Sequence, residues 1–266
     1  MLDVEFAQLS DPGRVRGHNE DYLGSVVPAT PAQARSHGWL FALADGVGGQ
    51  ERGEVASRTA IESVIAGFRR APPGQPLPGL LTRLIQAANA HVLDAGLAAS
   101  PGGVNMATTI VACALRFDRA VLAHAGDSRC YLIRRGHASV MTRDHTVANE
   151  QLRLGILSNR EAAAVDTRHL LTRSLGTSFF VNVETGGCQV FPGDVLVLCS
   201  DGLHGALDST DLTRLLTRNC DLDLAVKDLV GLANAKDGSD NISVLAARVR
   251  EVERVGMYRG RPYKLH

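Results

Sequence analysis

An apolar run that leads directly into an acidic residue and a glycine cluster constrains this chain more than any other stretch. Residues 41–49 read Phe-Ala-Leu-Ala-Asp-Gly-Val-Gly-Gly. A continuous apolar run is typical of a strand buried on both faces, so the pattern predicts a core strand with Asp45 at its tip. Gly46 permits a sharp turn and leaves its carbonyl group uncovered, because it has no Cβ. A carboxylate beside a bare carbonyl suits Mg²⁺ or Mn²⁺, although a strand followed by Asp-Gly is also an ordinary turn.

Acidic residues recur at the ends of other strand-like runs. Asp201 directly follows an apolar run and Asp127 follows another across one glycine, whereas Asp240 and the pair Glu20 and Asp21 each precede one. Carboxylates buried close to one another are unstable unless positive charge lies between them. Few lysines or arginines are close to these acids in the sequence. The repeated arrangement therefore favours a divalent metal site over a series of unrelated turns.

One arginine stands apart in the polar turn before the early acids. Arg16 lies four residues before Glu20. Its planar guanidinium suits a bidentate grip on a phosphoryl group that metals also hold. On its own, Arg16 would be read as a surface residue, so its assignment depends on the metal site.

The charge balance gives no reason to expect nucleic acid or an anionic membrane as a partner. The 266 residues include 28 Lys and Arg and 28 Asp and Glu, so the formal net charge is zero. Arg259, Arg261 and Lys264 form the one local basic group, which we interpret as a solvated terminal tail.

Cysteine usage and the lack of targeting signals predict a cytoplasmic protein. The five cysteines are odd in number and form no Cys-x-x-Cys pair, which favours reduced thiols and argues against a zinc site. The N-terminus carries acids where a signal peptide needs bases, and no run approaches the roughly 18 apolar residues that span a bilayer. The cysteines are Cys113, Cys130, Cys188, Cys199 and Cys220.

The order of the predicted elements indicates an α+β fold with four layers. Two amphipathic helical patterns lie early and two lie late, with short strands and tight turns between them and one last strand at 242–249. This order suits a single domain in which two antiparallel sheets pack face to face with a helical pair on each outer side, an αββα sandwich. Residues 28–37 are expected to form a loop. The helical patterns begin at residues 51, 80, 208 or 209, and 222.

Taken together, the motifs resemble the PP2C (PPM) family of metal-dependent protein serine/threonine phosphatases, in its compact bacterial branch. The matching stretches occur in the family's order and span about residues 6–249. They are residues 10–21, 44–49, 125–129, 144–146, 199–203 and 238–243.

The resemblance implies a two-metal centre with Mn²⁺ or Mg²⁺ in the cleft between the sheets. Asp45 would bridge the two ions, and the Gly46 carbonyl would ligate one of them. Asp201 and Asp240 would complete the protein ligands of the other ion. A water activated by the metals would attack phosphorus in line, so no protein nucleophile is required.

The same resemblance assigns roles around this centre. Glu20 and Asp21 would hold metal-bound waters or ligate directly, and Asp127 would belong to a possible third, weaker metal site. Arg16 would bind the substrate phosphate, which places it with Asp45, Asp201 and Asp240 in the catalytic set. The expected domain covers residues 1–252 with a mobile flap at about 148–176, and residues 253–266 form the tail.

One position departs from the family pattern. Many animal and plant members carry a histidine, proposed to protonate the leaving alkoxide, where this chain has Val47. A metal-bound water then becomes the favoured acid, with His18 and His145 as weaker candidates that are more simply explained by structural hydrogen bonds. Leaving groups of high pKa, such as serine, should be affected more than aryl groups.

Three functions remain open at this point. The leading one is a phosphoprotein phosphatase that acts on phosphoserine and phosphothreonine as a monomer and opposes a bacterial serine/threonine kinase. The alternatives are a catalytically silent binding or regulatory protein of the same fold, and a hydrolase of small phosphate esters. The presence of Asp45, Asp127, Asp201 and Asp240 argues against the silent protein.

Overall fold

Two antiparallel sheets pack face to face in the computed structural model, which describes residues 1–47, 52–99, 105–218, 221–258 and 261–264. Sheet I has the strand order β1 (Asp3–Asp11), β10 (Ile242–Glu251), β9 (Val195–Cys199), β6 (Arg129–Arg134) and β7 (His137–Val140). Sheet II has the order β2 (Asp21–Val26), β3 (Trp39–Asp45), β4 (Ile110–Arg116), β5 (Arg119–Ala125) and β8 (Glu184–Gln189). All pairings within these two sheets are antiparallel.

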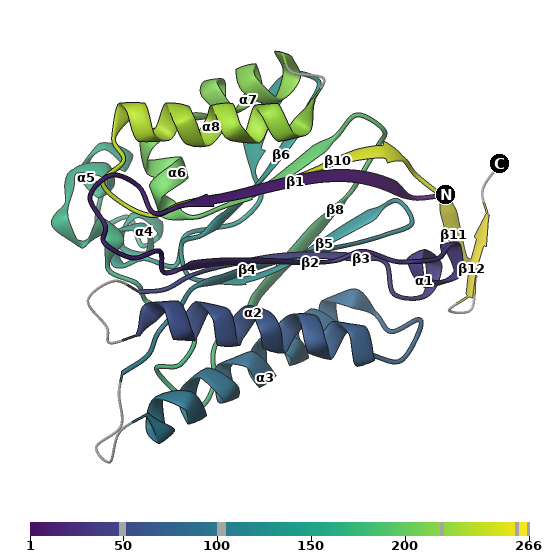
Figure 1. The fold of residues 1–266 in the computed structure, drawn as a ribbon, viewed down its shortest axis with the longest axis horizontal. Coiled ribbons are helices and arrows are strands. Elements are labelled where there is room, and N and C mark those ends of the chain that lie inside the picture. The colour runs from purple at the N-terminus through teal and green to yellow at the C-terminus, as the bar shows by residue number, and fades with distance from the viewer. Residues whose placement is uncertain (48–51, 100–104, 219–220, 259–260, 265–266) are drawn as a thin grey trace.

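A helical layer covers the outer face of each sheet (Figure 1). Helices α2 (Gly53–Arg70) and α3 (Leu77–Ala98) pack on sheet II, and α7 (Ser209–Arg218) and α8 (Leu222–Lys236) pack on sheet I. Each helix buries an apolar face against its sheet. The predicted αββα sandwich is therefore confirmed.

Strand β3 shows how the two faces of one strand build two different cores. Leu40, Ala42 and Ala44 contribute to the core beneath α2 and α3, whereas Phe41 and Leu43 contribute to the core between the sheets. All five side chains are fully buried. The continuous apolar pattern arises because successive side chains alternate between two buried faces.

Two short helices were not predicted. The expected loop at 28–37 contains α1 (Pro31–Ser36), which begins because the Thr30 hydroxyl accepts the N–H of Gln33 at 3.2 Å and Pro31 occupies the first turn. Helix α6 (Asp201–Ala206) begins at the acid that follows β9. Both helices have six residues, which is too short for a helical period to appear in the sequence.

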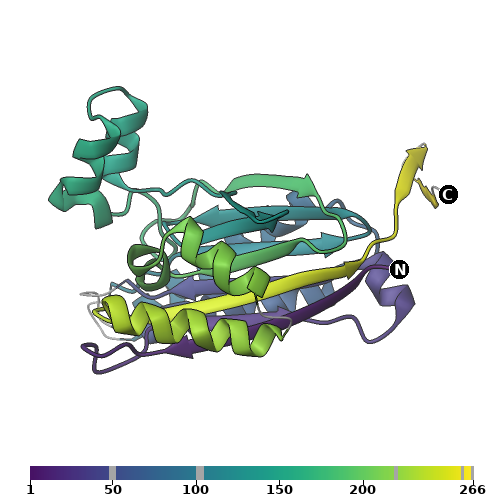
Figure 2. The same cartoon turned by 90° about the horizontal axis from the view of Figure 1, so that it is seen from above.

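The region predicted to contain the flap forms a helical segment that stands away from both sheets (teal-green in Figure 2). It contains α4 (Val147–Arg153), α5 (Asn159–Ala164) and the 3₁₀ helix η1 (Asp166–His169). We call residues 147–170 the flap. Its two ends meet where Val147 donates its N–H to the Leu170 carbonyl at 2.8 Å.

The terminal tail also has regular structure. Strands β11 (Val255–Tyr258) and β12 (Arg261–Lys264) pair with each other in antiparallel fashion and project from the body (Figure 2), in the region predicted to be a solvated terminal tail. Arg259 lies outside the described residues, as do Gly48 and Gly49.

The described cysteines are free, as predicted for Cys113, Cys130, Cys188 and Cys199. Cys220 lies outside the described residues. No helix in the described part of the chain combines the length and apolar character needed to cross a membrane.

Replacing Phe41 tests the core between the sheets. Phe41 is fully buried and its ring lies 5.3 Å from that of Phe6 and 6.2 Å from that of Trp39, measured between centroids. We expect Phe41→Ala to lower the free energy of unfolding by about 3–5 kcal/mol, because it leaves a cavity. Chemical denaturation measures this change. Val15→Ala is the control, because Val15 is 73% exposed and should change stability by less than about 0.5 kcal/mol.

Candidate metal centre

The acids predicted from the sequence gather at one end of the two sheets. Asp21 and Asp45 are directly opposite each other in the β2–β3 pairing. Asp201 follows β9 and Asp240 precedes β10, and these two strands are neighbours in sheet I. Antiparallel pairing thus brings acids from distant parts of the chain to the same edge of the sandwich, near α6 in Figure 1.

Asp45 lies at the electrostatic centre of this group. Loss of hydration raises its pKa well above the ordinary value, and the neighbouring charges of Asp21, Asp201, Asp127 and Asp240 raise it further, in that order. Carboxylates interact in this way only when they are close together. The acids therefore form one cluster around Asp45.

Asp21 is a buried member of the cluster whose carboxylate is poorly hydrogen-bonded. Its side chain is buried, and neither carboxylate oxygen has a well-oriented hydrogen bond to the described residues. Loss of hydration raises its pKa to about 7, against an opposing effect of the nearby Ser243 and Ser200 hydroxyls. A buried carboxylate without a partner is what an oxygen-binding cation would satisfy.

Asp127 joins the cluster from the turn after β5. Loss of hydration and the charge of Asp201 raise its pKa to about 7. His204 of α6 lies with Nε2 3.0 Å from the Asp127 carbonyl oxygen, which ties this turn to the helix that carries Asp201. Asp201 itself has a raised pKa, first from loss of hydration and then from the charge of Asp240.

Gly46 lies in a space that admits no side chain. An added Cβ would be 2.5 Å from the Gly53 carbonyl oxygen and 2.8 Å from that of Glu20. Its own N–H donates to the Glu20 carbonyl at 3.1 Å, whereas its carbonyl oxygen accepts no hydrogen bond from the described residues. The predicted bare carbonyl is therefore present beside Asp45.

Glu20 is held in place through its own backbone N–H, which bonds to a side-chain amide. Its N–H donates to Asn241 Oδ1 at 2.8 Å, and Asn241 Nδ2 donates to the carbonyls of Pro12 and His18 at 3.0 and 2.9 Å. Loss of hydration, then the charge of Glu54, raises the pKa of Glu20. Asn241 thus fixes the turn that carries Glu20 and Arg16, a role that its position in the 238–243 motif did not reveal.

Arg16 reaches the cluster at its solvent side. Its Nη2 lies 2.7 Å from Asp240 Oδ2, and its side chain is 44% exposed. The exposed guanidinium has room to bind a ligand while it remains next to the acids. The structure thus brings Arg16 next to Asp240, whose hydrogen bond raises the pKa of the guanidinium, and the charges of Glu20 and Asp201 raise it further.

The donor set fits a divalent cation of the Mg²⁺ or Mn²⁺ type. It consists of carboxylates and one peptide carbonyl, which are hard oxygen ligands. The buried oxygens of Asp21 have no hydrogen-bond partner with good geometry among the described residues, so they are available to a cation.

A second group of possible metal ligands consists of two histidines and a glutamate. His124, His145 and Glu184 each offer a ligand atom, all within 4.8 Å of one another, and the two imidazole rings stack at 4.6 Å. However, Arg143 Nη2 lies 2.7 Å and Arg173 Nη1 3.8 Å from the same Glu184 oxygen. These cations already supply the positive charge, so the group fits a structural network better than a metal site.

His145 belongs to this network and not to the carboxylate cluster. It is fully buried, its Nδ1 accepts the Gly126 N–H at 3.1 Å, and its Nε2 lies 3.2 Å from Glu184 Oε2. Loss of hydration lowers its pKa to about 4. It is therefore neutral at physiological pH and has no free nitrogen to offer a substrate, which removes it as a candidate acid.

The flap contributes a histidine that the sequence analysis missed. His169 of η1 lies with Nδ1 4.0 Å from Asp201 Oδ2, and its side chain is 63% exposed. Nothing in its local sequence distinguishes it from a surface residue. Only the tertiary packing of the flap brings it next to Asp201.

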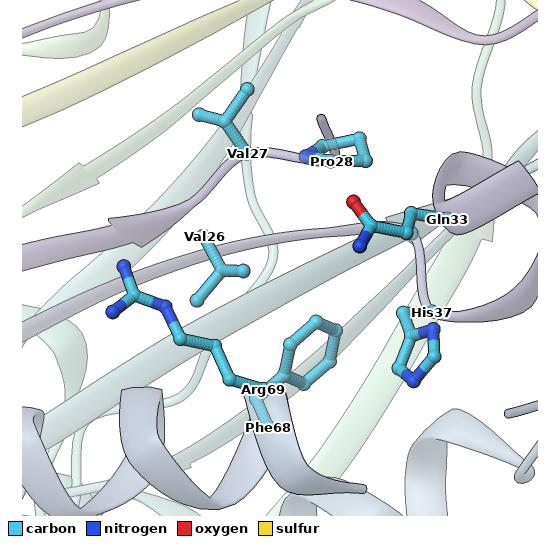
Figure 3. A pocket seen from close by; sticks show the side chains of 8 residues that line it. Val26, Val27, Pro28, Gln33, His37, Phe68 and Arg69 are labelled. Atoms are coloured by element: carbon cyan, nitrogen blue, oxygen red, sulfur yellow. The ribbon is translucent and has the colours of Figure 1, made fainter. Parts of the chain in front are cut away.

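A separate pocket of about 250 Å³ lies at the opposite end of strands β2 and β3 (Figure 3). Its lining contains no acid. The ring nitrogens of His37 are already bonded, one to the Ser36 hydroxyl at 2.8 Å and the other to the Ala71 carbonyl at 2.9 Å. This pocket therefore plays no part in the carboxylate cluster. It is lined by Val26, Val27, Pro28, Gln33, His37, Gly38, Phe68 and Arg69.

Comparisons with known proteins agree with this architecture. The sequence model of the family described as "Protein phosphatase 2C" matches residues 16–228. A putative protein phosphatase 2C-type from Streptococcus pyogenes is 31% identical over 246 residues, which cover 91% of this chain and 96% of the relative. The solved serine/threonine phosphatase of S. agalactiae has a TM-score of 0.85 and 31% identity, over 93% of this chain and 100% of that one. The catalytic domain of the phosphatase PstP, solved in complex with two manganese ions, has a TM-score of 0.77 and 30% identity, over 94% of this chain and 100% of that one.

The stabilisation that Mn²⁺ confers should increase with pH. Asp21 and Asp127 keep protons up to about pH 7, so at pH 6 a metal must displace protons that are already lost at pH 8. We expect the increase in unfolding free energy on adding Mn²⁺ to be about 1–3 kcal/mol larger at pH 8 than at pH 6. Thermal unfolding with and without Mn²⁺ at both pH values measures the difference. An increment that is equal at both values, or larger at pH 6, would contradict metal binding by these carboxylates.

Proposed function

Because this chain belongs to the protein phosphatase 2C family of metal-dependent serine/threonine phosphatases, we propose that its carboxylate cluster is the centre at which phosphoserine and phosphothreonine in proteins are hydrolysed. Asp45, Asp201 and Asp240 would hold the metal ions, with the Gly46 carbonyl as a further ligand. The single observation that carries this proposal is the cluster itself: Asp21 lies directly opposite Asp45 in the β2–β3 pairing, and acids from four other strand ends in all raise the pKa of Asp45.

The bound cations would be Mn²⁺ or Mg²⁺, two in number, and they would supply the lowering of the pKa of water that hydrolysis of a phosphate ester at neutral pH requires. The chain's own contribution is to hold the ligands in place. Asp45 is fixed through its backbone, because its carbonyl accepts both the Thr108 hydroxyl and the Thr109 N–H at 2.8 Å. Preorganised ligands of this kind need no rearrangement when substrate binds.

Arg16 would bind the phosphoryl group. Its guanidinium is exposed on one side and lies 2.7 Å from Asp240 on the other, so a phosphoryl oxygen near Asp240 would come within reach. A planar guanidinium can donate two parallel hydrogen bonds to such a group. This would orient the phosphoryl group and stabilise its negative charge.

The remaining acids would have supporting roles. Glu20 and Asp21 would hold waters of the metal centre or ligate directly, and Asp127 would belong to a third, weaker site. We further propose a domain over residues 1–252 with a tail at 253–266. Within that domain, a mobile segment at residues 148–176, which comprises nearly all of the flap and the six residues after it, would lie beside the site. The protein would act as a monomer in the cytoplasm against a serine/threonine kinase.

Asp201→Asn tests the assignment of the site. The substitution keeps the shape of the side chain but removes the charge, so we expect Mn²⁺-dependent hydrolysis of p-nitrophenyl phosphate to fall by at least about 100-fold. Asp208→Asn is the matched control: Asp208 is exposed and only caps α7, where it accepts the N–H groups of Thr210 and Asp211 at 2.9 Å. Unchanged turnover in Asp201→Asn would contradict the assignment. No turnover of phosphopeptides by an enzyme that cleaves free phosphate esters would favour a small-molecule hydrolase.

The pH dependence of kcat for a phosphoserine peptide tests how the leaving group is protonated. With Val47 in place of the family's histidine, we expect no titration limb near pH ~6.5, where free imidazole titrates. His18→Ala and His169→Ala should therefore leave the shape of the profile unchanged. A limb that disappears in either variant would assign the proton to that histidine.

A further inference from the structure

The loop that leads from the flap to β8 presents two adjacent aromatic side chains to solvent. Phe179 and Phe180 are 81% and 85% exposed, more than any other large apolar residue in the described chain. Leu175 and Val181, which flank the loop, are 0% and 5% exposed and belong to the core beneath α3. Neighbouring aromatic rings that remain in water between two buried anchors indicate a surface that binds something.

The backbone of this loop is held rigidly on α3. Asn89, which is fully buried, donates from Nδ2 to the carbonyls of Ser178 at 2.8 Å and Phe179 at 3.3 Å. Its Oδ1 accepts the N–H of Gly176 at 2.9 Å. The side-chain amide of Gln86, one turn earlier on α3, bonds both backbone groups of the residue that ends the loop. The two rings are thus displayed by a preorganised loop, which lowers the entropic cost of binding a partner.

The loop is connected to the candidate metal centre through backbone pairing. Thr108 bridges to Gly46 on one side and to Leu175 on the other. Two such steps span about 10 Å, and the four residues from Leu175 to Phe179 span at most about 14 Å. The backbone of Phe179 therefore lies within about 24 Å of Gly46, a distance that an extended peptide covers with about seven residues.

The size of the surface favours a short peptide over a second copy of the chain. At about 200 Å² per ring, the two exposed rings offer roughly 350 Å², which is under half of the roughly 800 Å² per partner in a stable interface. A small surface is sufficient when the ligand is already held elsewhere, because the tether raises the effective concentration of the second contact. A phosphoprotein segment whose phosphoryl group occupies the metal centre is tethered in this way.

We infer that Phe179 and Phe180 form a docking surface for apolar side chains of the phosphoprotein substrate, within about seven residues of the phosphorylated serine or threonine. This inference rests on the proposed function, because the tether is the phosphoryl group at the metal centre. It adds a preference for apolar residues around the phosphorylation site.

Two phosphoserine peptides and a double variant test the inference. The peptides carry either leucine or asparagine at the fourth to seventh positions on both sides of the phosphoserine. We expect the wild-type protein with Mn²⁺ to hydrolyse the leucine peptide with a roughly tenfold higher kcat/KM, mainly through a lower KM. Phe179→Ser combined with Phe180→Ser should abolish this preference. Hydrolysis of p-nitrophenyl phosphate, which is too small to reach the loop, should persist in this double variant.

Val140→Ser combined with Leu224→Ser is the matched control, because both side chains are about half exposed and lie on sheet I and its helical layer. This variant should keep the leucine preference. A preference that survives loss of both phenylalanines would overturn the inference, as would a wild-type dimer in sedimentation that the Phe179 and Phe180 substitutions dissociate. Absence of p-nitrophenyl phosphate hydrolysis by the wild-type protein would instead overturn the proposed function itself.

Discussion

Repulsion among carboxylates held close together out of water is the constraint on which the rest of this structure depends. Asp21, Asp45, Asp127 and Asp201 all have raised pKa values, in each case chiefly because hydration is lost. Such a cluster costs folding free energy unless protons or cations neutralise it. The chain maintains it because the two sheets and their helical layers bury enough apolar surface to hold the strand ends in place.

The antiparallel sheets provide this support in a specific way. The register of β2 on β3 sets Asp21 opposite Asp45, and a shift by one residue would turn the apolar side chains of β3 toward the wrong layers. Because one face of β3 carries two alanines and the other carries Phe41 and Leu43, that shift would mispack both cores. The same core that stabilises the fold therefore fixes the spacing of the acids.

Hydrogen bonds from polar side chains complete the arrangement around the cluster. Asn241 holds the turn that carries Glu20, and the His145 network fastens the Asp127 turn to the base of the flap through Gly126. Asn89 performs a similar task for the loop that displays Phe179 and Phe180. In each case a buried polar side chain satisfies backbone groups that sheet pairing leaves free.

The sequence by itself determined the four-layer fold, the strand that ends at Asp45 and the identity of the acids, because hydrophobic periodicity and the position of an acid at a strand end are local properties of the chain. Short elements such as α1 and α6 were missed, since six residues carry too little periodicity. Only the tertiary structure decided that His145 is buried and neutral, that His169 lies beside Asp201, and that Phe179 and Phe180 remain in solvent. Burial and proximity of this kind depend on which distant segments pack together, and no local pattern records that.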